Sequence, residues 1–124
     1  MTGRREPLRL HHVALRVSDC EAACAFYCGL LGLEQTRRSE EASGLASVWI
    51  QAGETILMLE RRLRGNGAES GSAHLLAFSV SDLHEWEDRL DRAGIAVEDR
   101  TTHTLYLRDP DGHRVALTTY PSSR

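Results

Sequence analysis

The chain repeats a short segment, and this repeat constrains its fold more than any other feature of the sequence. The segment ALRVSD at positions 14–19 returns as AFSVSD at 77–82, an offset of 63 (77 minus 14) with four of six positions identical. A second echo pairs GETILM at 53–58 with GHRVAL at 112–117. Each copy of such a repeat is one supersecondary unit that needs its partner to bury a face. The sequence therefore predicts an α+β fold of two βαβββ modules. Together they would form a curved mixed sheet, a half-barrel around a concave pocket, with the helices outside.

The length of the chain indicates how these modules are organised. A chain of 124 residues, 41% of them hydrophobic, can build one core and is too short for two. We expect a single domain spanning 1–124, with module one at about 9–60 and module two at about 74–120. Between them, the Arg-, Gly- and Ser-rich stretch at about 61–73 reads as a linker.

Charge and cysteine content narrow the possible partners and the compartment. A net charge of -3 argues against a nucleic-acid partner, and no apolar stretch is long enough to cross a bilayer or to act as a signal peptide. Cys20, Cys24 and Cys28 lie at helical spacing, which suits neither a disulfide nor, without a fourth ligand nearby, a metal. We interpret them as small apolar filler in a cytoplasmic, reduced protein.

Hydrophobic patterns place the elements of each module. For module one they predict a strand at 10–17, a helix that starts with a Ser18–Glu21 capping box and ends around 29–32, a polar loop or short edge strand at 37–44, and a hairpin of 47–50 with 55–59. For module two they predict a strand at 75–80, a helix capped by Asp82 or Ser81 and closed by Gly94, a short strand at 95–97, and a hairpin of 104–107 with 114–119.

Alternation divides the strand residues into two faces. One set is uniformly apolar and is expected to pack on the helices: Val13, Leu15, Val17, Val48, Ile50, Ile56, Met58, Leu76, Phe78, Val80, Leu105, Leu107, Val115 and Leu117. The other set is expected to line the pocket: His12, Ala14, Arg16, Ser47, Trp49, Thr55, Leu57, Leu59, Leu75, Ala77, Ser79, Thr104, Tyr106, Arg114, Ala116 and Thr118. This mixture of apolar, aromatic and a few polar groups is typical of small-molecule sites. It contains no Asp, Glu or Cys, with Glu60 assigned to the other face.

Three motifs match a known family: HVALRVSD at 12–19, Phe26-Tyr27 followed by LLGL at 30–33, and DPDG at 109–112. On these the chain resembles the vicinal oxygen chelate superfamily, which includes glyoxalase I, bleomycin-resistance proteins and extradiol dioxygenases. The resemblance covers roughly residues 9 to 120. It implies the two-module fold strongly and any one function weakly, because one fold hosts many chemistries.

The resemblance also implies where a metal would bind. Metal enzymes of this kind take ligands from the first and last strands of each module, and those positions here are His12, Leu57, Leu75 and Ala116. Only His12 is a donor for a divalent ion, which needs three or four His, Glu or Asp ligands. His74 would add a second donor only if a β-bulge turned it inward. No metal or other cofactor is therefore expected.

Three functions remain open. The favoured one is a metal-free protein of the glyoxalase/bleomycin-resistance type that sequesters an aromatic or amphipathic ligand, such as an antibiotic or a metabolite. Its ligand-binding residues would be His12, Arg16, Trp49, Leu57, Leu59, Leu75, Tyr106, Arg114 and Ala116, with the two aromatic rings against the ligand and the two arginines meeting an anionic group. The second is a metal-free enzyme with His12 as general base and Arg16 stabilising an oxyanion. The third is a metal-dependent lyase or dioxygenase.

A homodimer is the expected assembly, since a second copy would cover the exposed sheet edges.

Overall fold

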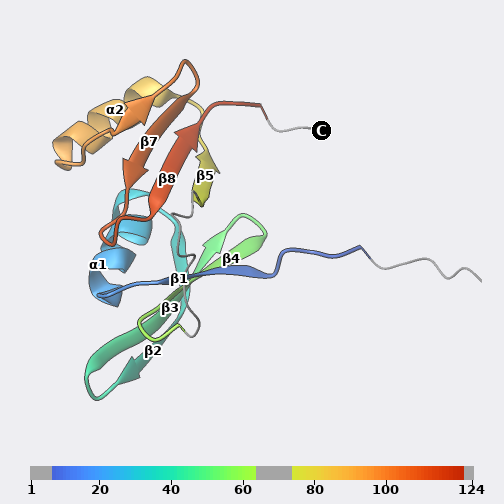
Figure 1. The fold of residues 1–124 in the computed structure, drawn as a ribbon, viewed down its shortest axis with the longest axis vertical. Helices are drawn as coiled ribbons and strands as arrows, with labels where there is room; N and C mark the ends of the chain where they lie inside the picture. The colour runs from blue at the N-terminus through green and yellow to red at the C-terminus, as the bar shows by residue number, and fades with distance from the viewer. Residues whose placement is uncertain (1–6, 64–73, 122–124) are drawn as a thin grey trace, which may run out of the picture. The chain divides into compact units, whose positions relative to one another are not determined.

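The computed structural model describes residues 7–63 and 74–121. The chain divides into two compact units, 1–64 and 65–124, which we call module one and module two. Each contains one strand, one helix and then three strands (Figure 1). The predicted α+β fold of two βαβββ units is confirmed. Most of the predicted linker at 61–73 lies outside the described residues.

Module one forms a four-stranded mixed sheet with one interrupted helix. Its elements are β1 (His12–Arg16), α1 (Cys20–Cys24), the π-helical segment η1 (Ala25–Leu30), β2 (Glu34–Glu41), β3 (Gly44–Ala52) and β4 (Thr55–Glu60). The strand order is β1-β4-β3-β2, with β1 parallel to β4 and the other pairs antiparallel. The polar segment expected as a loop or a short edge strand is β2, an edge strand of eight residues.

Module two repeats this topology. Its elements are β5 (Leu75–Ser79), α2 (Leu83–Arg92), β6 (Asp99–Arg100), β7 (Thr104–Arg108) and β8 (Arg114–Thr118), in the order β5-β8-β7-β6.

The prediction of a strand at 95–97 is wrong. The Ile95 N–H donates to the Leu90 carbonyl at 2.9 Å and so closes the helix, while β7 pairs with β6 two residues further on. Within the described part of the chain, neither helix is long and apolar enough to cross a membrane.

Both helices begin at an aspartate. Asp19 accepts hydrogen bonds from the backbone N–H groups of Glu21 at 2.9 Å and Ala22 at 3.1 Å, and Asp82 caps α2 in the same way. The predicted Asp82 cap is confirmed, whereas the predicted Ser18 cap is wrong by one residue. Asp19 has the extended backbone that an N-cap requires (φ -140°), and its short carboxylate reaches two of the N–H groups that the first turn leaves unpaired.

α1 packs on β3 and β4, and its contacts identify the face of the sheet that it covers. Its Cys24 thiol lies 3.3 Å from the Gln35 side chain, and its Glu21 pairs with Arg38 at 3.4 Å. The residues paired with Gln35 and Arg38 in the sheet are the buried Ile50 and Val48. Register continues this face across β4, where Leu57 and Leu59 lie opposite Ile50 and Val48 and are 3% and 0% exposed.

The predicted faces of β4 are therefore inverted. Leu57 and Leu59 belong to the core under α1, not to the face of His12, and Ile56 and Met58 lie on the face of His12 and Trp49. Glu60, opposite Arg16, also lies on that face, so the expectation of no acidic residue there is wrong.

The inversion has a simple cause in the lengths of two turns. The repeat in the sequence pairs Gly53 with Gly112. In module one a two-residue turn, 53–54, joins the paired residues of β3 and β4, whereas in module two five residues, 109–113, join β7 and β8. In module one, Ile56 pairs with His12 of β1 and lies three positions after Gly53. In module two, Arg114 pairs with Leu75 of β5 and lies only two positions after Gly112. A slip of one residue moves every side chain of a strand to the other face.

In module two the predicted division into two faces is confirmed. Register places one apolar set on a single face: Leu76, Phe78, Leu105, Leu107, Val115 and Leu117. The four of these on β7 and β8 are almost fully buried, as is Leu90 of α2, which lies along one side of the sheet (Figure 1). The other face carries Leu75, Ala77, Tyr106, Arg114 and Ala116, as expected.

Candidate functional site

We call the face of each sheet that its own helix leaves uncovered the helix-free face. In module one it carries His12, Ala14, Arg16, Ser47, Trp49, Gln51, Ile56, Met58 and Glu60. Ala14, Met58, Trp49 and Arg37 form one row across the four strands. The Arg37 guanidinium lies 5.3 Å from the centre of the half-buried Trp49 ring, a cation–π contact. The centre of this face is thus an aromatic and thioether surface with a cation at one edge.

Arg16 lies on this face, but its guanidinium group is hydrogen-bonded to the backbone of the protein. Its Nε donates a hydrogen bond to the Leu63 carbonyl at 3.0 Å, and a second guanidinium nitrogen donates to the same oxygen. The expected contact of Arg16 with an anionic ligand would therefore compete with a backbone acceptor already in place.

His12 is exposed at the start of β1. Its Nδ1 lies 2.9 Å from Nδ1 of His11, and the two rings meet edge to face at 5.1 Å. Two imidazole Nδ1 atoms form a hydrogen bond only when one of them carries the proton. The contact engages Nδ1 and leaves Nε2 of His12 as the nitrogen that can hydrogen-bond to a ligand.

Glu60 is too far from His12 to act with it. The two side chains share a face, but Glu60 lies opposite Arg16, four residues along β1 from His12. At ~3.3 Å per residue, four residues span about 13 Å. Direct proton exchange between the two groups would need a hydrogen-bonding distance near 3 Å.

In module two the helix-free face is centred on Tyr106. The Arg114 guanidinium lies 4.4 Å from the centre of the Tyr106 ring, and Ala116 lies opposite that ring in β8. Thr104 and Thr118 exchange a hydroxyl hydrogen bond of 2.9 Å at the end of the same face. Leu75, opposite Arg114, is 39% exposed.

The two modules place their aromatic residues at equivalent positions. Trp49 lies opposite Met58, which is itself opposite Ala14, and Tyr106 lies opposite Ala116, which is opposite Ala77. Each ring also has an arginine against it, from β2 in module one and from β8 in module two. Each of these two faces can by itself bind a flat apolar group beside an anionic one.

Sequence reasoning missed two members of the module two face. Arg108 lies opposite Arg114, and Glu98 contacts both of these arginines. Arg108 follows Tyr106 by two positions, so alternation alone could have placed it there. Glu98 precedes β6 and carries no periodic signal.

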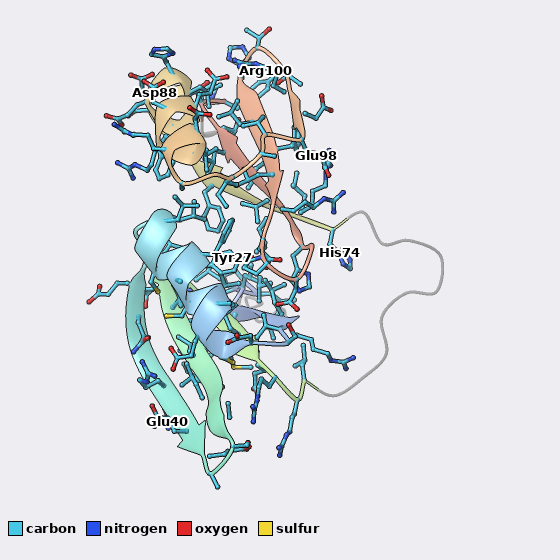
Figure 2. The ribbon with its side chains drawn as sticks, turned by 90° about the vertical axis from the view of Figure 1, so that its left-hand side faces the viewer. Tyr27, Glu40, His74, Asp88, Glu98 and Arg100 are labelled. Carbon is cyan, nitrogen blue, oxygen red and sulfur yellow. The ribbon has the colours of Figure 1, made fainter. Side chains whose placement is uncertain are left out.

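The metal positions implied by the family resemblance are corrected by the register. Because Met58 corresponds to Ala116 by its place in the sheet, the position in β4 is Met58 and not Leu57. Module one then offers His12 and Met58, and module two offers Leu75 and Ala116, so the residues present do not fit a divalent ion. In 7–63 and 74–121, no three His, Cys, Asp or Glu side chains are grouped as metal ligands. His74 (Figure 2) is exposed just before β5, which pairs regularly with β8 from its first residue.

The three cysteines are free thiols, with Cys20 buried and Cys24 and Cys28 half-buried. Burial raises the pKa of the Cys20 thiol, which donates to the Ala46 carbonyl at 3.3 Å. Burial, and then the hydrogen bond with Cys24, raises the pKa of Cys28 to about 12. Thiols held protonated in this way are poor nucleophiles, which fits packing groups rather than reactive ones.

Comparisons with known proteins agree on the family and differ in activity. The family model described as Glyoxalase/Bleomycin resistance protein/Dioxygenase superfamily matches residues 9–117. The chain is 30% identical over 121 residues to a lactoylglutathione lyase of Neisseria meningitidis, with 87% of this chain and 88% of the relative covered. The crystal structure of a lactoylglutathione lyase from Agrobacterium tumefaciens superposes with a TM-score of 0.69 at 25% identity, covering 92% of this chain and 95% of that one. TnmS3, an antibiotic binding protein from Streptomyces sp. CB03234, superposes with a TM-score of 0.70 at 20% identity, covering 93% and 98%.

Proposed function

Because the chain belongs to the glyoxalase, bleomycin-resistance and dioxygenase superfamily, we propose that it is a metal-free protein that binds and sequesters an aromatic or amphipathic small molecule, such as an antibiotic or a metabolite. One observation carries this proposal. The positions that would hold a metal carry His12 and Met58 in module one and Leu75 and Ala116 in module two, while Trp49 and Tyr106 occupy the centres of the helix-free faces of these modules.

The physical basis of binding is the burial of apolar surface against these rings. Covering an aromatic side chain removes a large apolar area from water, and each Å² of apolar surface buried contributes about 25 cal/mol of favourable free energy. A stacked or edge-on aromatic contact adds about 0.5–1.5 kcal/mol to that term. Met58 and Ile56 extend the apolar surface around Trp49 on the helix-free face of module one. The thioether of Met58 adapts readily to different ligand shapes.

A metal-free enzyme is the second candidate, and the exposed Nε2 of His12 is the observation in its favour. Acid–base catalysis of this kind needs a partner group within hydrogen-bond reach of the reacting atoms. Glu60 does not supply it, since it lies opposite Arg16 at the far end of β1. The binding function requires no such partner and is therefore preferred.

The purified protein is expected to contain well below one transition-metal ion per chain. Three of the four positions implied for ligands carry side chains that do not bind divalent ions. Elemental analysis after mild dialysis measures this directly. One Zn, Fe, Mn or Ni ion per chain, lost on His12→Ala, would contradict the proposal and favour the metal-dependent enzymes of the family.

Trp49→Ala is expected to weaken binding of the neutral aromatic probe 2-naphthamide by about 1–3 kcal/mol, because it removes a large aromatic contact. Titration calorimetry on the full chain gives the dissociation constants. Trp86→Ala is the matched control, since Trp86 lies on α2 against Arg89 and not on a helix-free face. Circular dichroism verifies that both variants are folded. Equal binding by the parent and Trp49→Ala would remove Trp49 from the site, and no binding by the parent would contradict the proposed function.

A further inference from the structure

Two arginines share a single carboxylate on the helix-free face of module two. Arg108 and Arg114 lie directly opposite each other in β7 and β8. Glu98 reaches both: one carboxylate oxygen accepts a hydrogen bond from Arg108 Nε at 2.8 Å, and the other lies 3.9 Å from Arg114 Nε. Figure 2 shows Glu98 on the side of this sheet away from α2, whereas Asp88 projects from the helix.

The two guanidinium groups are satisfied to different degrees. Arg108 donates to Glu98 and, through Nη1, to the Gly112 carbonyl at 3.0 Å. Arg114 makes no hydrogen bond to any group in the described part of the chain, because its distance to Glu98 is too long for one. Its side chain is only 30% exposed and its guanidinium lies against the Tyr106 ring. A guanidinium carries five N–H donors, so this half-buried group has donors ready for an additional acceptor.

The acidic groups near this pair differ in how they engage the two arginines. Two guanidinium groups face one Glu98 carboxylate. Among the strand residues of module two that the structure describes, Asp99 is the acidic residue paired on this face, opposite Tyr106, and its Oδ1 accepts from the backbone N–H of Arg100 at 2.8 Å. In the part of the chain that the structure describes, Asp99 pairs with neither arginine. The contact between Arg108 and Glu98 is half exposed on both sides, and ion pairs of this kind contribute little to stability.

We propose that Glu98 occupies the place of a ligand carboxylate. The Arg108–Arg114 pair binds the carboxylate of an aromatic or amphipathic acid whose apolar part lies against Tyr106 and Leu75, and Glu98 competes with that carboxylate for the same donors. The planar fork of a guanidinium matches a carboxylate, which is the group that the protein itself places between the two arginines. This inference rests on the proposed binding function and names the chemical class of its ligand.

The test compares 2-naphthoate with its uncharged isostere 2-naphthamide by titration calorimetry on the full-length chain. Glu98→Gln removes the competing charge and is expected to bind 2-naphthoate about threefold or more tightly, with 2-naphthamide unchanged. Arg114→Gln is expected to weaken 2-naphthoate by about tenfold, the range for a charged hydrogen bond, with a smaller effect on 2-naphthamide. Glu85→Gln and Arg92→Gln on exposed positions of α2 make the same changes of net charge away from the site.

Each outcome decides the inference. It is wrong if Glu98→Gln leaves 2-naphthoate binding unchanged or weaker, because Glu98 would then position the arginines rather than compete. It is also wrong if Glu85→Gln tightens 2-naphthoate as much, since net charge alone would explain the gain. Binding of 2-naphthamide by the parent with no preference for 2-naphthoate would overturn the inference and leave the proposed function standing. Failure of the parent to bind either probe would overturn both.

Discussion

Leu59→Ala is expected to lower the free energy of unfolding by about 2–5 kcal/mol, the cost of a large-to-small change in a packed core. Leu59 is fully buried on the face of β4 that α1 covers, opposite Val48 and Leu15. Truncation removes the side-chain contacts and leaves a cavity that the paired strands on both sides cannot close. Urea denaturation followed by circular dichroism measures the loss.

Met58→Ala is the matched control, one residue earlier on the same strand. Met58 is half-buried and lies on the helix-free face, so its truncation is expected to cost about 1 kcal/mol or less of stability. The opposite order, with Met58→Ala more destabilising than Leu59→Ala, would show that β4 pairs one residue out of the register described.

Asp109→Ala is expected to lower the free energy of unfolding by about 1–3 kcal/mol. Asp109 is 5% exposed, and its Oδ1 accepts hydrogen bonds from the backbone N–H groups of Asp111 and His113, both at 2.8 Å. The substitution removes the acceptor of two hydrogen bonds in the β7–β8 turn, and each such bond contributes about 0.5–1.5 kcal/mol. The same urea experiment measures the effect.

Asp109→Asn separates hydrogen bonding from charge. An amide oxygen can accept the same two bonds, so this variant is expected to lose less than half of what Asp109→Ala loses. If Asn and Ala are equally destabilising, the negative charge rather than the acceptor geometry holds the turn.

The topology was predictable because the repeat records it directly. Asp19 and Asp82, 63 positions apart (82 minus 19), start the two helices, and strands equivalent to β1 and β5 precede them. The faces of β7 and β8 were predictable from alternation alone, as Leu105 and Tyr106 show. The faces of β4 were not, because its residues from Thr55 to Leu59 are nearly all apolar and give no alternation. The register then depended on the turn, whose length differs between the modules.

The chemistry of the candidate site depends on contacts that no local pattern encodes. Arg16 donates to Leu63, 47 positions away, and Glu98 meets Arg108 across a bend of the chain. Both contacts exist because the folded sheet brings distant parts of the backbone close together, and this proximity cannot be seen in a local stretch of sequence. Sequence reasoning could assign Arg16 and Arg114 to a face but could not tell which guanidinium already has an acceptor.

The π-helical segment η1 buries two consecutive aromatic side chains. Its wider turn, seen in the bond from Leu31 N–H to the Phe26 carbonyl at 3.0 Å, lets the consecutive residues Phe26 and Tyr27 both be buried, with their rings 5.0 Å apart. In geometric terms it holds one residue more than an α-helix of the same span. Deleting one residue there would restore regular 3.6-residue turns over the same span, in which consecutive side chains point about 100° apart. The extra residue therefore lets two neighbouring aromatic side chains share one buried region.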